Sequence, residues 1–63
     1  MKDLIAEFKS DFRKQYSFIY FEDYVSDKQI AKFIENNIDE TYQNMLWYFS
    51  DWVQSQGLCD VVE

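Results

Sequence analysis

The sequence has 63 residues, a formal net charge of −6, 21% aromatic residues, one cysteine and no histidine. This length allows one domain, the single cysteine excludes an internal disulfide, and the lack of histidine argues against a structural zinc site. A chain of this size buries only about 60% of its unfolded surface. It must therefore rely on an unusually aromatic core or on burial against a second chain.

The negative charge is confined to the second half of the chain. All six Lys and Arg residues precede Phe33, where six acids balance them, whereas residues 33–63 carry acids and no base. These acids are Glu35, Asp39, Glu40, Asp51, Asp60 and Glu63. A surface with one sign of charge repels phosphate and attracts basic partners, although the same charge also favours solubility.

The chain shows no sign of a targeting or membrane segment. Acids interrupt the N-terminal residues, so no signal-peptide apolar run is visible. No stretch approaches the ~20 apolar residues of a membrane span. The lone Cys59 is typical of a reducing compartment. We therefore expect a cytoplasmic protein that has no membrane partner.

Residues 3–16 are predicted to form the first helix. Their apolar side chains recur at i, i+3 and i+4 spacing, which indicates one helical stripe. The stripe consists of Leu4, Ile5, Phe8, Phe12 and Tyr16. The stripe could extend to Ile19, so the sequence does not define the last residue of this helix to within several positions.

Residues 17–25 do not identify their own secondary structure. Aromatic and β-branched residues favour a strand, but the only other strand-like segment is 58–62, and an isolated two-stranded pairing is weak. We favour continued helix or an ordered apolar connector, with a minor pairing of 17–25 and 58–62 as the alternative.

Residues 26–36 begin with the clearest local signal in the chain. Ser26 and Gln29 have the spacing of a capping box, and Val25 and Ile30 occupy the positions of a hydrophobic staple. These residues predict a helix whose first residues are fixed by side-chain hydrogen bonds.

The last helix is predicted over residues 38–56. The second helix should end at the pair Asn36 and Asn37, because Asn tolerates the left-handed conformation found at such ends. Asn37 or Asp39 should then cap the last helix, since Asn37 and Glu40 again have capping-box spacing. Gly57 is placed to end it in a left-handed conformation.

The last helix has two faces of different character. At 100° per residue, an apolar stripe of about 120° faces the core; it contains Tyr42, Met45, Leu46, Phe49, Trp52 and Val53. Trp47 lies on the opposite face, with Tyr48 at its boundary. The other residues of that face are Glu40, Gln43, Asn44, Ser50, Asp51 and Gln54.

Together these elements predict a small all-α domain of three helices with an aromatic-rich connector. The α+β alternative adds the minor pairing of residues 17–25 and 58–62. The expected core comprises Leu4, Ile5, Phe8, Phe12, Ile19, Ile30, Phe33, Ile34, Tyr42, Met45, Leu46, Phe49, Trp52 and Val53.

Trp47 is the principal candidate for a functional residue. A tryptophan on the polar side of a helix is unusual, and Trp is enriched at interaction hot spots. The alternative is that residues 17–25 or the C-terminal tail cover it within the same chain.

These patterns favour a non-enzymatic interaction module that binds, and by binding inhibits, a larger protein with a basic surface. Trp47 and Tyr48 would anchor the contact, and the surrounding acids would steer it. The expected contact residues are Asp39, Glu40, Gln43, Asn44, Trp47, Tyr48 and Asp51. Small acidic proteins of phage or mobile-element type that mimic nucleic acid offer an analogy only.

Two alternatives use the same features differently. Exposed aromatic residues could close a self-interface in a structural homo-oligomer, such as a homodimer. Residues 26–46 also have the coarse layout of a helix-turn-helix DNA-binding regulator. However, the helix from Asp39 onward carries no base to neutralise phosphate, so we expect no direct nucleic-acid contact.

Catalytic chemistry has little support in the sequence. Without histidine, the usual nucleophile–base pair cannot form, and Cys59 has no basic neighbour to lower its pKa. Glu22, Asp23 and Asp27 lack the glycine-containing loop of a calcium site. We therefore expect no enzymatic activity, no metal and no cofactor.

Overall fold

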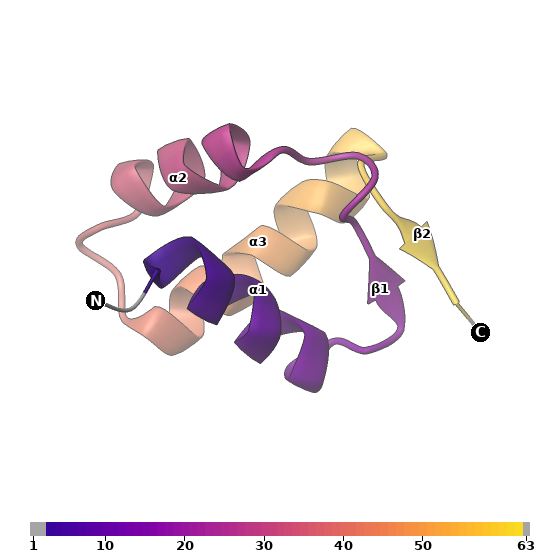
Figure 1. Cartoon of the computed structure of the whole chain (residues 1–63), viewed down its shortest axis with the longest axis horizontal. Coiled ribbons are helices and arrows are strands. Elements are labelled where there is room, and N and C mark those ends of the chain that lie inside the picture. Colours follow the sequence, from indigo (N-terminus) through magenta and orange to yellow (C-terminus); the bar gives the residue numbers. More distant parts are fainter. Residues whose placement is uncertain (1–2, 63) are drawn as a thin grey trace.

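A computed structural model describes residues 3–62, which form three helices and a two-stranded ribbon (Figure 1). In chain order the elements are α1 (Leu4–Gln15), β1 (Ile19–Tyr20), α2 (Asp27–Asn36), α3 (Tyr42–Gln56) and β2 (Asp60–Val61). In Figure 1 the ribbon lies at one end of the helical part. The predicted three-helix architecture is therefore confirmed, together with the minor pairing given as its alternative.

Helix α1 begins where a carboxylate caps its first turn. The Asp3 side chain accepts hydrogen bonds from the backbone amides of Ile5, at 3.0 Å, and Ala6, which satisfies donors that no helical carbonyl can reach. The prediction that Leu4 is a core residue was wrong, because its side chain is 48% exposed. On a helical projection Leu4 is about 80° away from the buried Phe12, at the edge of the apolar stripe.

Helix α2 has the capping box that the sequence predicts. The Ser26 hydroxyl accepts from the Gln29 amide, and the Gln29 side chain accepts from the Ser26 amide at 2.9 Å. The helix ends at Asn37 without the expected left-handed conformation, since φ there is −119°. Instead, the Asn37 side chain donates to the carbonyl of Phe33 at 2.8 Å, which satisfies a terminal acceptor.

Helix α3 begins later than predicted. Asn37 and Asp39 do not cap it: the Glu40 amide donates to the carbonyl of Asn37, closing a turn, and Thr41 is the N-cap, with its hydroxyl accepting from the amide of Asn44 at 3.1 Å. The C-terminal prediction was correct, because Gly57 has φ 68° and ends the helix in the left-handed region.

The segment between α1 and α2 is neither helix nor simple connector. Strand β1 pairs antiparallel with β2, with Ile19 opposite Val61 and Tyr20 opposite Asp60, and the Val62 amide donates to the carbonyl of Phe18 at 2.7 Å. Our preference for continued helix or a connector was therefore wrong at Ile19 and Tyr20, whereas residues 21–25 form the expected connector. The pairing forms here because Ile19 is buried against the helices, which gives a short ribbon the packed face it needs.

One aromatic ring from α3 joins all parts of the core. The fully buried Phe49 ring lies 5.1–5.2 Å, between ring centroids, from the rings of Phe8, Phe12, Phe21 and Phe33. All four contacts are edge-to-face, the geometry that ring quadrupoles favour. Thus α1, the segment after β1, and α2 all pack on a single residue of α3.

Most of the expected core is buried, with two additions. Phe21 and Val25 are buried although periodicity did not select them. Four expected core residues are only partly buried and pack against its edge: Ile5, Phe33, Tyr42 and Trp52. Ser50, which the helical projection groups with Trp47, is buried, because it borders Leu46 one turn earlier.

Candidate interaction surface

The exposed side of α3 presents two aromatic rings to solvent. Trp47 is 61% exposed and Tyr48 is 40% exposed. The two rings stack on each other, with centroids 5.9 Å apart and planes inclined by 13°. Neither residues 17–25 nor the described part of the C-terminal tail covers Trp47, in contrast to the alternative considered from the sequence.

Amide side chains lie beside these rings on the same helix. Gln43 and Gln15 exchange two side-chain hydrogen bonds, of 2.6 and 3.3 Å, which link α3 to α1. Asn44 donates weakly to Glu40 at 3.5 Å. Gln43 stands one turn before Trp47, so the two residues occupy neighbouring positions on the helix surface.

The acids of this surface come from two places. Asp51 is exposed one turn after Trp47, whereas Asp39 and Glu40 are exposed in the turn that precedes α3. The side chain of Asn44 thus links Glu40 to the helix, whereas no interaction resolved within residues 3–62 links Asp39 to it. We call the set Asp39, Glu40, Gln43, Asn44, Trp47, Tyr48 and Asp51 the α3 outer face.

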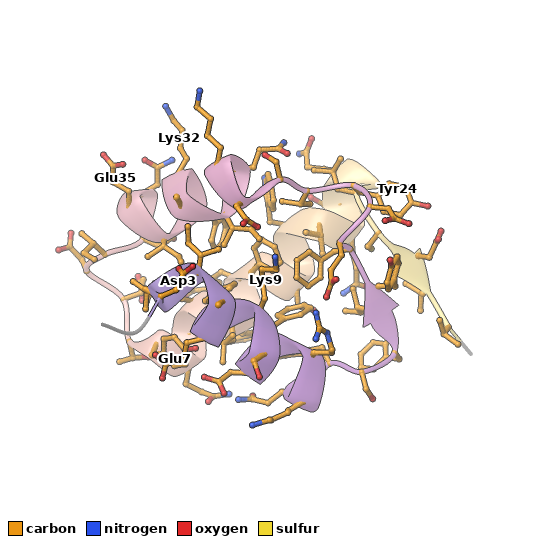
Figure 2. All side chains as sticks on the ribbon, viewed as in Figure 1. Asp3, Glu7, Lys9, Tyr24, Lys32 and Glu35 are labelled. Carbon is orange, nitrogen blue, oxygen red and sulfur yellow. The ribbon has the colours of Figure 1, made fainter. Side chains whose placement is uncertain are left out.

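The two ion pairs resolved in residues 3–62 lie away from α3. Lys9 on α1 pairs with Asp27 at 2.9 Å, and Figure 2 shows Lys9 directed from α1 towards α2. Arg13, also on α1, pairs with Glu22. These two cations are therefore engaged elsewhere, and α3 itself has no base.

A second exposed apolar surface lies on and beside the ribbon, and sequence reasoning did not identify it as a site. We call it the ribbon patch; it consists of Phe18, Tyr20, Tyr24, Val61 and Val62, all exposed. Only the antiparallel pairing brings its two segments together. Strand alternation was the one available signal, and two-residue strands are too short to display it.

Carboxylates raise the pKa of both tyrosines in the ribbon patch. The Tyr24 hydroxyl donates to Asp60 at 2.8 Å, and this hydrogen bond raises the pKa of Tyr24. The pKa of Tyr20 is raised chiefly by the charge of Asp23. Both pKa shifts indicate that Tyr20 and Tyr24 lie in a negative local field.

Cys59 does not have the surroundings of a reactive thiol. Burial, and to a smaller extent the charge of Asp60, raise its pKa above the ordinary value. The thiol therefore stays protonated at neutral pH, whereas the thiolate is the nucleophile and the metal ligand.

No group of three or more acids or cysteines within residues 3–62 is arranged to hold a metal ion. None of the helices resolved here has both the length and the apolar character required to cross a membrane.

Comparison with protein-family models, with curated proteins and with solved structures found no significant match. Function must therefore be inferred from the two exposed surfaces of the chain.

Proposed function

We propose that the protein is a non-enzymatic, cytoplasmic interaction module that binds a larger protein with a basic surface through the α3 outer face. The observation that carries this proposal is the exposure of Trp47, stacked on Tyr48 in the middle of an acidic and amide-rich surface. Large exposed aromatic rings supply much of the binding free energy at protein interfaces.

The stacked pair is suited to an anchoring role. Stacking restricts both rings before any partner arrives, so less side-chain entropy is lost on binding. The Gln43–Gln15 hydrogen bonds fix the helix beside the rings. A partner would therefore meet a preformed surface.

The charges around the rings select the partner. Asp39, Glu40 and Asp51 are exposed and unopposed by any base on α3, so they attract a positive surface and repel phosphate. Association should therefore slow as salt rises, because exposed charges are screened over about 8 Å at physiological ionic strength. If the partner uses its basic surface to bind nucleic acid, occupation of that surface would inhibit it.

Affinity capture with matched variants tests the proposal. Wild-type protein and Leu4→Ala, which trims an exposed apolar side chain on α1 instead, should retain the same partner. Trp47→Ala should weaken binding of the purified partner at least tenfold, the equivalent of about 1.4 kcal/mol. Unchanged affinity for Trp47→Ala, or association that is insensitive to salt, would contradict the proposal.

A further inference from the structure

The ribbon patch requires an explanation that the α3 outer face does not provide. Phe18, on β1's N-terminal side, is 46% exposed, and Val62, just after β2, is 62% exposed. These two residues are brought side by side by the Val62–Phe18 backbone hydrogen bond. Exposed apolar side chains that gather in this way mark interaction sites more often than isolated ones do.

The strand register explains why the patch faces outward. Ile19 is buried, so its neighbours Phe18 and Tyr20 point to the opposite side of the strand. Directly opposed residues of an antiparallel pair share a face, so Asp60 lies on the same side as Tyr20. Val62, two residues further on, also lies on that side. Val61 lies opposite Ile19 on the other face of the ribbon, although its side chain is 52% exposed.

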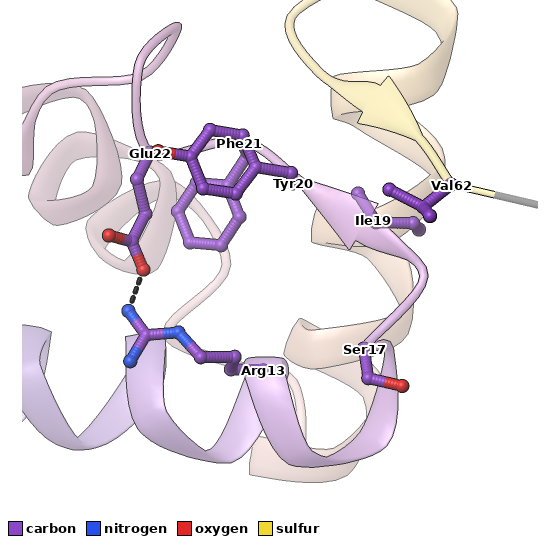
Figure 3. A pocket seen from close by; sticks show the side chains of 7 residues that line it. All are labelled: Arg13, Ser17, Ile19, Tyr20, Phe21, Glu22 and Val62. Atoms are coloured by element: carbon purple, nitrogen blue, oxygen red, sulfur yellow. Dashed lines mark ion pairs between the residues drawn. The ribbon is translucent and has the colours of Figure 1, made fainter.

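A hollow of about 480 Å³ opens beside the ribbon, and its lining includes residues from the end of α1 and from both faces of β1. Figure 3 shows its lining residues: Ser17, Ile19, Tyr20, Phe21 and Val62, with Arg13 and Glu22 at one wall. Most of its wall is therefore apolar or aromatic. The hollow is open to solvent and of the size that a single large apolar side chain could enter.

The charge around the hollow is negative. Arg13, the base in its lining, is neutralised by its ion pair with Glu22, drawn as a dashed line in Figure 3. Asp23 acts on Tyr20, and Asp60 accepts from Tyr24, so two carboxylates border the patch without an opposing base among their resolved contacts. A second copy of this chain would bring the same carboxylates against themselves, which disfavours self-association.

We propose that the ribbon patch and its hollow form a second docking site, which takes a basic protein segment bearing an apolar anchor side chain. The anchor enters the hollow between Tyr20 and Val62. Flanking lysine or arginine side chains pair with Asp23 and Asp60 and lie over the exposed rings, where a cation is attracted to the π-face. The site is separate from Trp47 and does not depend on it.

The probe for this site is a synthetic peptide of alternating lysine and leucine with blocked ends, titrated into isotopically labelled full-length protein. Backbone amide shifts should move at residues 18–20 and 60–62. A glutamate–leucine peptide of the same length is the control, and it should bind at least tenfold more weakly.

Three variants decide the outcome. Val62→Ser should weaken binding of the lysine–leucine peptide at least tenfold. Asp23→Asn should also weaken this binding and should reduce its dependence on salt. Leu4→Ser, at a comparably exposed apolar position on α1, should leave binding unchanged. The amide spectrum of each variant shows directly whether it is folded.

Each contrary result has a distinct meaning for the site. Equal binding of the acidic peptide, full affinity for Val62→Ser, or amide shifts confined to residues around Trp47 would overturn it. Shifts at residues 18–20 that depend on protein concentration without peptide would assign the patch to a second copy of the chain, again overturning the proposal. Trp47→Ala should leave peptide binding at the ribbon unchanged, which separates this site from the α3 outer face.

Discussion

The α3 outer face and the ribbon patch both expose aromatic side chains next to acids, yet they are built in different ways. The outer face comes from one continuous segment, α3 and the turn before it, and the opposite side of this helix holds the fold together through Phe49. The ribbon patch comes from segments about 40 residues apart in the sequence, joined by a two-residue pairing. The first surface can thus change without affecting the fold, whereas the second exists only while the pairing holds.

The largest expected difference between the regions is in stability. Ile19→Ala removes a buried side chain beneath the ribbon patch, which should lower the free energy of unfolding by about 2–5 kcal/mol. Trp47→Ala removes a mostly exposed ring and should change it by no more than about 0.5 kcal/mol. Urea unfolding followed by circular dichroism measures both. Similar losses of unfolding free energy for the two variants would show that the two surfaces do not differ in their importance for the fold.

Gly57 controls whether the chain can turn from α3 into β2. Its φ of 68° lies in the left-handed region, and no atom would obstruct an added Cβ, so Gly57→Ala adds conformational strain alone. We expect a loss of about 1–2 kcal/mol. Gln56→Ala, at the last residue of α3, is the matched control and should be nearly neutral. Unchanged stability of Gly57→Ala would show that the turn is not required.

Tyr42 links the first turn of α3 to α1 and should give a pH signature. Burial, together with the 2.6 Å hydrogen bond to Asp11, raises the pKa of Tyr42 above its ordinary 10.0. A raised native pKa stabilises the fold fully below pH 10, and that contribution is lost as pH rises above it.

Tyr42→Phe tests this link. It should cost about 1 kcal/mol at neutral pH and should make the alkaline fall in stability smaller than in wild type. Thermal unfolding between pH 8 and pH 11 measures both effects. Tyr24→Phe makes the same comparison at the ribbon, where the pKa of Tyr24 is also raised. A wild-type alkaline slope in Tyr42→Phe would contradict the assignment.

The same contrast explains what the sequence could and could not predict. Helical periodicity and capping chemistry are local, so the Ser26–Gln29 box, Gly57 and, except for the buried Ser50, the opposed faces of α3 were predicted correctly. Thr41 was not predicted as the cap of α3; its side chain can cap a helix as those of Asn37 and Asp39 can, and the geometry of the preceding turn decides which of them does so. The burial of Phe21 depends on rings of α1 and α3, and no local pattern contains those contacts.

Fluorescence quenching can show whether Trp47 is exposed in a negative field. Trp52→Phe leaves Trp47 as the only indole. In a demonstrated monomer, acrylamide should quench Trp47 nearly as well as it quenches free tryptophanamide, and caesium should quench it more strongly than iodide, because Asp51 and Glu40 attract the cation and repel the anion. Resistance to acrylamide, or stronger quenching by iodide than by caesium, would contradict this placement of Trp47.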